Sequence, residues 1–552
     1  MEFSQKNRNQ MKQSLMTNEF EVLVIGGGIT GAGIALDAVT RGMKTALVEM
    51  QDFGAGTSSR STKLVHGGLR YLKQFEVKMV AEVGKEREVV YENGPHVTTP
   101  EWMLLPLHAG GNFGKFSTSI GLRVYDYLAG VKKSERRKML GIQETLNKEP
   151  LIKKEGLKGG GFYVEYRTDD ARLTIEVTKA AFEKNAVMVN YTKVKELLYK
   201  NGKVIGATVH DQLSGETYDI FAEKVINATG PWVDTIREKD GSKKGKTLQL
   251  TKGVHLVIDQ QRFPLKQAIY FDTPDGRMIF AIPRSKKVYV GTTDTFFNND
   301  LVSPRATNAD REYIIDAVNY MFPDVKLITD DIESSWAGIR PLILEEGKKP
   351  SEISRKDEIW ESETGLITIA GGKLTGYRKM SEMVVDLIVK KIEGEKNKTF
   401  PTCRTKKYPI SGGRVGGSKG FPQFIKNQIK TGINLGLSEE ETTDLSSFFG
   451  SNINRVFNLI DMNKDSAEKY GLPLPLFAKL LYALEEEMAA TPLDFWYRRT
   501  GYLLFDIELV RKYKYEVLEF MADYFSWSEK EKENHLEELY RELLFACTPA
   551  DK

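Results

Sequence analysis

Residues 20–50, FEVLVIGGGITGAGIALDAVTRGMKTALVEM, decide the fold of this chain. The run 20–25 is short and mainly apolar, which is typical of a strand buried on both faces. Apolar residues then recur at helical spacing until Gly42, a helix stop, and residues 44–50 read as a second strand. A strand, a helix and a strand within about 30 residues predict a βαβ unit.

The glycines of this stretch indicate a dinucleotide site. Gly26, Gly28 and Gly31 match G-x-G-x-x-G directly after the strand, and Glu49 ends the second strand. The first glycine permits a tight turn, the second lets a pyrophosphate approach the backbone, and the third allows the helix to pack closely on the strand. Glu49 can accept hydrogen bonds from ribose hydroxyls and disfavours a 2′-phosphate, so NADP is the least favoured ligand. The loop alone leaves FAD and NAD open.

A second turn of small residues favours the prediction that the chain binds a flat cofactor. Asn227-Ala228-Thr229-Gly230 follows the apolar run 224–226 and can bring backbone close to a ligand, although an ordinary β-turn would also explain it. The chain contains one G-x-G-x-x-G, so a reductase with two dinucleotide folds loses support. Electrons are therefore expected to enter from a small substrate.

Composition places the chain among ordinary globular proteins. Its 552 residues are 41% hydrophobic and 28% charged, and the net charge is +3, which argues against disorder and against a nucleic-acid binder. Two cysteines and six histidines favour neither a disulfide framework nor a metal site, so we expect a reducing compartment, the cytoplasm. No apolar run is long enough to span a bilayer, and the polar residues 1–17 indicate a flexible tail rather than a signal peptide.

Hydrophobic patterning predicts a mixed α and β body followed by helices. Strands are expected at 203–210, 224–228, 255–258, 278–282, 288–291 and 366–370, and helices at 170–184, 308–321, 376–392, 475–488 and 506–524. A polar, glycine-rich connector at 405–417 separates the body from the helical part.

Seven further segments, spread in order over residues 20 to 390, resemble the FAD-dependent glycerol-3-phosphate dehydrogenase family. They are TSSRSTKLVHGGLRYL (57–72), DDARL (169–173), NATGPWV (227–233), KGVH (252–255), GTTD (291–294), AGIRPL (337–342) and GGKLTGYR (371–378). The NATG and GGK pieces also occur across a wider group of flavoproteins that oxidise amines and amino acids.

The resemblance implies an α/β architecture in which a Rossmann-like FAD-binding domain is interwoven with a mixed-sheet substrate domain and followed by an all-α C-terminal domain. The FAD-binding domain is expected at 18–94, 160–240 and 335–395, the substrate or cap domain at 95–159 and 241–334, and the helical domain at 400–552.

The activity implied by the resemblance is the oxidation of sn-glycerol 3-phosphate to dihydroxyacetone phosphate, with FAD reduced and then reoxidised by a membrane quinone. A phosphate dianion requires charge-assisted donors, and arginine can give it two parallel bonds. Arg340 is the first candidate for this role. The further substrate-binding candidates are Arg70, Tyr71, Arg355 and Lys373.

Proton transfer from the substrate C2 hydroxyl has two candidate residues. His255 is expected to act as a base or to orient the hydroxyl. Arg340 can instead stabilise the developing alkoxide electrostatically, which would make a dedicated base unnecessary. His66 is expected beside the flavin.

Flavin contacts are carried over from the family onto matching positions. Gly26, Gly28, Gly31 and Glu49 form the dinucleotide turn, and Ser58 and Ser59 are candidate pyrophosphate donors or simple helix caps. Gly68, Leu69, Gly230, Leu374 and Thr375 are expected near the ring or the ribityl chain, and Val194 near the adenine.

A quinone acceptor requires access to the bilayer, so we expect peripheral attachment at the inner face of the cell membrane. The candidate contacts are the basic run 132–138 and the aromatic and basic run 495–499, although such runs are more often solvated surface and core, respectively. A monomer and a homodimer both stay open. Alternative functions are a glycerol-3-phosphate oxidase that forms hydrogen peroxide, an amino-acid-oxidising flavoenzyme and a non-catalytic FAD-binding module.

Overall fold

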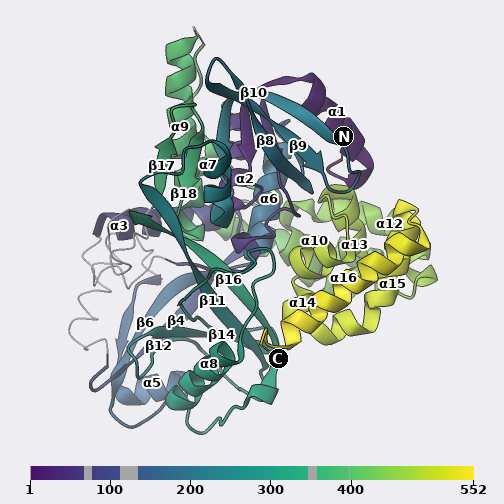
Figure 1. Cartoon of the computed structure of the whole chain (residues 1–552). Helices are drawn as coiled ribbons and strands as arrows, with labels where there is room; N and C mark the ends of the chain where they lie inside the picture. Colours follow the sequence, from purple (N-terminus) through teal and green to yellow (C-terminus); the bar gives the residue numbers. More distant parts are fainter. Residues whose placement is uncertain (1, 67–76, 112–134, 346–356, 397, 552) are drawn as a thin grey trace.

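The structure, a computed structural model, describes residues 2–66, 77–111, 135–345, 357–396 and 398–551. Figure 1 shows a sheet layered with helices, a second, larger sheet below it, and a group of C-terminal helices that lies beside both. The two sheets are built from alternating stretches of the chain. The predicted fold class, a Rossmann-like domain interwoven with a mixed-sheet domain and followed by helices, is confirmed.

The first sheet has eight strands within the described residues, in the order β17-β18-β10-β1-β2-β7, with β8 and β9 continuing from β10. β18, β10, β1, β2 and β7 run parallel, and β17 runs antiparallel at the edge. The strands are β1 (Glu19–Ile25), β2 (Thr45–Val48), β7 (Val187–Val189), β8 (Thr192–Lys200), β9 (Lys203–Asp211), β10 (Thr217–Asn227), β17 (Glu358–Glu361) and β18 (Ile367–Ala370).

Helix α2 (Ile29–Thr40) connects β1 to β2 and completes the predicted βαβ unit. It is buried along most of its length because α6 (Asp170–Phe182) and α9 (Tyr377–Glu395) pack against it. Gly33 permits the contact with α9, since a Cβ there would lie 2.4 Å from the Ser381 Oγ. The remaining helices near this sheet are α3 (Val77–Asn93) and α7 (Val233–Lys239).

The second sheet has ten strands within the described residues, in the order β15-β11-β14-β13-β12-β4-β6-β3, with β16 on β11 and β5 on β6. One face packs on α8 (Asn308–Met321) through Leu256 and Val290, and the other carries Trp336 and Tyr289 toward the C-terminal helices. The strands and the small helix α5 are β3 (Leu64–Val65), β4 (Thr98–His108), β5 (Lys138–Leu140), α5 (Ile142–Lys148), β6 (Leu157–Thr168), β11 (Lys246–Asp259), β12 (Ala268–Asp272), β13 (Met278–Arg284), β14 (Lys287–Gly291), β15 (Thr295–Phe296) and β16 (Ile332–Glu345).

The C-terminal part is helical, as predicted. It consists of α10 (Gly417–Asn434), α11 (Glu439–Phe449), α12 (Ile453–Lys469), α13 (Leu474–Glu486), a π-helix η11 (Asp494–Arg499), α14 (Tyr502–Phe505), α15 (Ile507–Phe525) and α16 (Glu529–Cys547). α14 and α16 contact β16, and η11 contacts α6, so these helices touch both sheet-bearing parts.

The N-terminal segment differs from the flexible tail that its polar composition indicated. Residues 8–17 form helix α1 (Arg8–Thr17), whose Met11 and Leu15 are buried. Two of the polar residues are buried as ion pairs, because both Arg8 and Lys12 reach the carboxylate of Asp211. Composition could not reveal these pairs, since Asp211 lies far along the chain.

Candidate functional site

The glycine turn has the close contacts that its motif predicts. Gly26 has φ +110°, and a Cβ there would lie 2.6 Å from the Ala228 carbonyl oxygen. A Cβ at Gly31 would lie 1.9 Å from the Gly26 carbonyl oxygen, so this glycine lets α2 approach the turn. The Ser58 hydroxyl accepts a hydrogen bond from the Ile29 amide at 2.9 Å and thereby caps the start of α2.

Glu49 lies at the carboxyl end of β2, beside this turn. Its carboxylate accepts hydrogen bonds from the Gly27 amide at 2.6 Å and from the Gln51 amide at 2.8 Å. Burial raises the pKa of this carboxyl, and the two amides oppose that effect. The acid is therefore held firmly at one end of the turn.

A cavity of about 310 Å³ runs past both features. Its wall includes the carboxyl ends of β1 and β2, the start of α2, the loop after β2 and the turn after β10, which is where open parallel sheets bind ligands. The predicted flavin contacts that line it are Gly26, Gly28, Glu49, Ser58, Val194, Gly230 and Leu374. Gly26 and Gly28 have no side chain, which fits the close approach of a pyrophosphate. The carboxylate of Glu49 fits the ribose of a dinucleotide.

Four other predicted flavin residues lie near this cavity without lining it. Gly31 packs the helix as described above, and the buried Ser59 is placed to bond the Gly56 carbonyl at 3.5 Å. The Thr375 hydroxyl donates to the His66 carbonyl at 3.1 Å, and the His66 ring lies edge-on to Phe280 with centroids 6.0 Å apart. Five predicted residues lie outside the described residues: Gly68, Leu69, Arg70, Tyr71 and Arg355.

Three glycines leave one face of the second sheet without side chains at their positions. The pairing register places Gly253 opposite Gly338 and His255 opposite both Gly291 and Trp336, so all five positions share a face. A Cβ at Gly253 would lie 2.2 Å from the Arg340 Nη2, and a Cβ at Gly291 would lie 2.3 Å from the His255 ring. Gly253 and Gly291 therefore make room for the two predicted catalytic side chains, whereas a Cβ at Gly338 would lie 2.1 Å from the Arg60 carbonyl oxygen.

His255 is buried on this face. Its ring stacks on Trp336 with centroids 4.7 Å apart and planes 9° apart, and its Nε2 lies 3.0 Å from the Thr62 hydroxyl. Burial lowers the pKa of His255 well below its usual value, and the positive charges of Arg340 and Lys63 lower it further. The imidazole is therefore neutral at pH 7.

Arg340 is held over Gly253 and is partly exposed. Its Nη2 donates to the Thr292 hydroxyl at 2.9 Å, and its Nη1 donates to the Thr293 carbonyl at 3.2 Å. Pro341, the next residue, lines the cavity together with Lys373. The cavity thus reaches the strand that carries Arg340. The register places Arg340 opposite Thr251, on the same face as His255.

Four residues of this face were not predicted individually: Thr62, Lys63, Thr292 and Trp336. Thr62 and Lys63 belong to the motif at 57–72, and Thr292 belongs to GTTD, so the resemblance contained a signal for them. Trp336 immediately precedes AGIRPL.

The aromatic and basic run 495–499 is not a membrane-contacting surface. All five side chains are buried, and Trp496 has no exposed area. The arginines of this run are compensated by buried carboxylates, which allows them to lie in the interior. Of the other candidate run, Arg136 and Lys138 are exposed, whereas 132–134 lie outside the described residues. None of the described helices combines the length and the apolar character needed to cross a bilayer.

The fold and its cavity define a Rossmann-type dinucleotide-binding protein. Comparison with known proteins narrows the class further. Residues 21–377 match the family model described as FAD dependent oxidoreductase, and residues 403–532 match the C-terminal domain of alpha-glycerophosphate oxidase.

Two relatives carry the same name. The aerobic glycerol-3-phosphate dehydrogenase of Bacillus subtilis is 62% identical over 551 residues, covering 100% of this chain and 99% of the relative. That of Staphylococcus haemolyticus is 59% identical over 541 residues, covering 98% and 97%.

Two solved structures are also similar. The glycerol-3-phosphate dehydrogenase of Bacillus halodurans complexed with FAD is 51% identical, has a TM-score of 0.87, and covers 100% of this chain and 99% of that chain. The L-alpha-glycerophosphate oxidase of Mycoplasma pneumoniae is 18% identical, has a TM-score of 0.56, and covers 71% of this chain and 99% of that chain, so it shows the fold alone.

The chain belongs to the aerobic glycerol-3-phosphate dehydrogenase family of FAD-dependent oxidoreductases. The family confirms the prediction of FAD and resolves the choice between FAD and NAD that the glycine loop left open.

Proposed function

We propose that this protein oxidises sn-glycerol 3-phosphate to dihydroxyacetone phosphate with FAD and passes the electrons to a membrane quinone. The observation that carries the proposal is the glycine-cleared face on which Arg340 and His255 lie together beside the end of the dinucleotide cavity. The full-length similarity to aerobic glycerol-3-phosphate dehydrogenases supports the substrate.

FAD supplies the acceptor for the hydride that leaves C2 of the substrate, while the C2 hydroxyl loses a proton. The residues proposed to hold FAD are those lining the cavity, together with Gly31, Ser59, His66, Gly68, Leu69 and Thr375. Glu49 would bind the ribose, because its carboxylate lies at the end of β2 beside the turn.

His255 would receive a hydrogen bond from the C2 hydroxyl, because a neutral imidazole keeps a lone pair. The same lowering of its pKa makes it a weak base, so proton removal from an unassisted alcohol would be inefficient. The guanidinium of Arg340 supplies the missing stabilisation by lowering the energy of the developing alkoxide. We therefore assign the two residues a shared role.

The phosphate of the substrate would bind to cations near the cavity end. Lys373 lines the cavity and is the described candidate besides Arg340. Arg70, Tyr71 and Arg355 stay predictions for this role.

The proposal is tested by mixing the purified flavoprotein with substrate under anaerobic conditions. We expect sn-glycerol 3-phosphate to bleach the visible flavin absorbance with stoichiometric formation of dihydroxyacetone phosphate, whereas glycerol, glycine and L-proline leave it unchanged. A flavin that sn-glycerol 3-phosphate does not bleach would refute the proposal and favour a non-catalytic FAD-binding module. Bleaching by an amino acid would favour the amino-acid-oxidising alternative.

A glycerol-3-phosphate oxidase is the second candidate, because residues 403–532 match a domain described from alpha-glycerophosphate oxidase. The two functions differ in the electron acceptor. Reoxidation of the bleached flavin by a soluble quinone analogue much faster than by air-saturated buffer supports the quinone. Stoichiometric hydrogen peroxide without a quinone supports the oxidase.

Peripheral attachment at the inner face of the cell membrane would give the flavin access to a quinone. Among the described residues, the exposed Arg136 and Lys138 are the candidate contacts. A double Arg136→Glu, Lys138→Glu variant should float less with anionic liposomes than the unaltered protein. Equal flotation would exclude these residues from the contact.

A further inference from the structure

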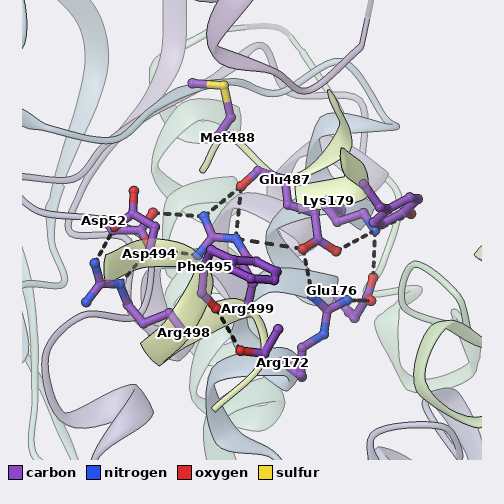
Figure 2. A network of polar contacts seen from close by, with 12 residues as sticks. Asp52, Arg172, Glu176, Lys179, Glu487, Met488, Asp494, Phe495, Arg498 and Arg499 are labelled. Carbon is purple, nitrogen blue, oxygen red and sulfur yellow. Dashed lines mark hydrogen bonds and ion pairs between the residues drawn. The ribbon is translucent and has the colours of Figure 1, made fainter. Parts of the chain in front are cut away.

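A buried network of charges joins the C-terminal helices to the dinucleotide-binding part of the molecule (Figure 2). It contains four acids and four bases, each at most 6% exposed: Asp52, Glu176, Glu487 and Asp494, with Arg172, Lys179, Arg498 and Arg499. The dinucleotide-binding part contributes Asp52, which follows β2, and three members on α6. The C-terminal part contributes the other four, which lie between α13 and α14. Because a buried ion is costly without its partner, each side chain holds the position of the next.

Asp52 lies in a loop whose neighbouring residues line the dinucleotide cavity. Its carboxylate accepts hydrogen bonds from the Arg498 Nε at 2.7 Å, from the Arg499 Nη1 and Nη2 at 2.6 and 2.9 Å, and from the Asn190 amide at 3.0 Å. The two arginines lower the pKa of Asp52 to about 2 against the opposing effect of its burial. The carboxylate is therefore ionised and bound on both oxygens.

The backbone around Asp52 forms part of the cavity wall. Glu49 and Met50 line the cavity on one side of it, and residues 55–58 line it on the other. The segment between them, residues 51–54, belongs to no helix or strand, and its Gly54 amide donates to the Gly27 carbonyl at 3.0 Å. Besides this backbone bond, the Asp52 side chain anchors the loop to the C-terminal helices through Arg498 and Arg499.

A second part of the wall is bound to the same network. The Tyr191 hydroxyl donates to Asp494 at 2.6 Å, and Asn190 bonds both Asp52 and the Met488 carbonyl at 3.0 Å. Thr192 and Val194, which follow directly, line the cavity. Asp494 is in turn paired with Arg498, so one arginine is linked to both wall segments.

We propose that Arg498 and Arg499 are positioning residues for FAD. They fix the loop after β2 and the turn before β8. These two segments are bonded to each other, since the Thr192 amide donates to the Glu49 carbonyl at 2.6 Å and the Tyr191 amide to the Gln51 carbonyl at 2.7 Å, and both line the Glu49 end of the cavity, although neither arginine does. A wall held in its binding conformation loses less conformational freedom when the ligand enters, so affinity for FAD depends on the C-terminal helices.

The test compares two Arg→Lys variants of the full chain. Arg498→Lys keeps the charge but removes the planar fork that reaches Asp52 and Asp494 together. Arg455→Lys is the matched control, because Arg455 lies on α12 and forms a partly exposed ion pair with Glu486 at 2.6 Å. Flavin-free protein is titrated with FAD and followed by flavin fluorescence, and KM for sn-glycerol 3-phosphate is measured at saturating FAD.

We expect Arg498→Lys to raise the dissociation constant of FAD at least tenfold and to leave KM within twofold, whereas Arg455→Lys changes neither. Hydrogen exchange of the flavin-free Arg498→Lys protein should be faster at residues 49–56 and 190–194 than in the unaltered protein, with the strands of the second sheet unchanged. A dissociation constant within twofold of the unaltered protein, an equal loss in Arg455→Lys, or exchange raised uniformly over the chain would overturn the proposal.

A milder variant keeps the proposal testable if Arg498→Lys does not fold. Tyr191→Phe removes the hydroxyl that binds Asp494 and leaves every ion of the network in place. We expect it to weaken FAD binding about threefold with KM unchanged, because it removes one hydrogen bond of the network and leaves the direct bonds of Arg498 and Arg499 to Asp52 in place. Unchanged FAD affinity in Tyr191→Phe overturns the role of the network in that case.

Discussion

Gly253→Ala should impair catalysis while leaving the fold intact. The alanine Cβ would lie 2.2 Å from the Arg340 Nη2 and 2.5 Å from the Thr292 Oγ1, both of which are ends of side chains that can move. An ordinary contact begins at 3.4 Å, so the guanidinium must shift by about 1.2 Å. Gly253 lies in β11 and does not have a positive φ, so alanine is compatible with the backbone.

The cost follows from the interactions of Arg340. The shift breaks its 2.9 Å hydrogen bond to Thr292 and misplaces its charge relative to the substrate oxygen. A hydrogen bond to a charged group contributes about 1.5–3 kcal/mol, so kcat/KM should fall roughly 10- to 150-fold. The midpoint of thermal unfolding should change little, because the Arg340 side chain is partly exposed and can move toward solvent.

The measurement is steady-state kinetics with a quinone analogue, together with thermal unfolding. Gly394→Ala is the matched control, because a Cβ at Gly394 meets no atom within 4 Å. If Gly253→Ala keeps kcat/KM within twofold of this control, Arg340 does not act from its observed position. If the variant instead unfolds many degrees earlier, the glycine serves packing rather than catalysis.

Three further outcomes follow from the structure. Gly31→Ala should abolish FAD retention in purified protein, because its Cβ would lie 1.9 Å from backbone at Gly26, and normal flavin content would contradict this account. Arg8→Ala should lower the free energy of unfolding in urea by about 3–5 kcal/mol, since it leaves the buried Asp211 without one of its partners; a loss below about 1 kcal/mol would mean that α1 is dispensable. Lowering the pH below about 6.5 should cost up to about 1.4 kcal/mol of stability per pH unit through His255, because its folded pKa is depressed and the unfolded chain then binds the extra proton. His255→Gln should therefore show a shallower fall between pH 6.5 and 5, and an unchanged slope would show that His255 titrates normally.

The local sequence was sufficient to predict the dinucleotide-binding unit. The apolar run before Gly26, the helical spacing after it and the position of Glu49 are all set within 30 residues, and the structure has β1, α2 and β2 at these places. Strands and helices with clear periodicity, such as α6 and α8, were predicted for the same reason.

Features that depend on distant partners could not be predicted from local patterns. Gly253, Gly291 and Gly338 form one cleared face only because the register of β11, β14 and β16 brings them together. Arg8 and Arg499 read as polar or surface residues until Asp211 and Asp52 are placed beside them. The boundaries between the flavin and substrate domains stay predictions.

The separation of Asp52 from its arginines also has a consequence for biosynthesis. Arg498 follows Asp52 by 446 residues, so at about 5–20 residues per second the ribosome needs roughly 20 to 90 s to deliver it. During that interval the β1-α2-β2 unit is already synthesised, but its acidic loop lacks the counter-ions that order it. Nascent chains would therefore acquire a tight flavin pocket only near the end of translation, and prematurely terminated products would leave the ribosome without one.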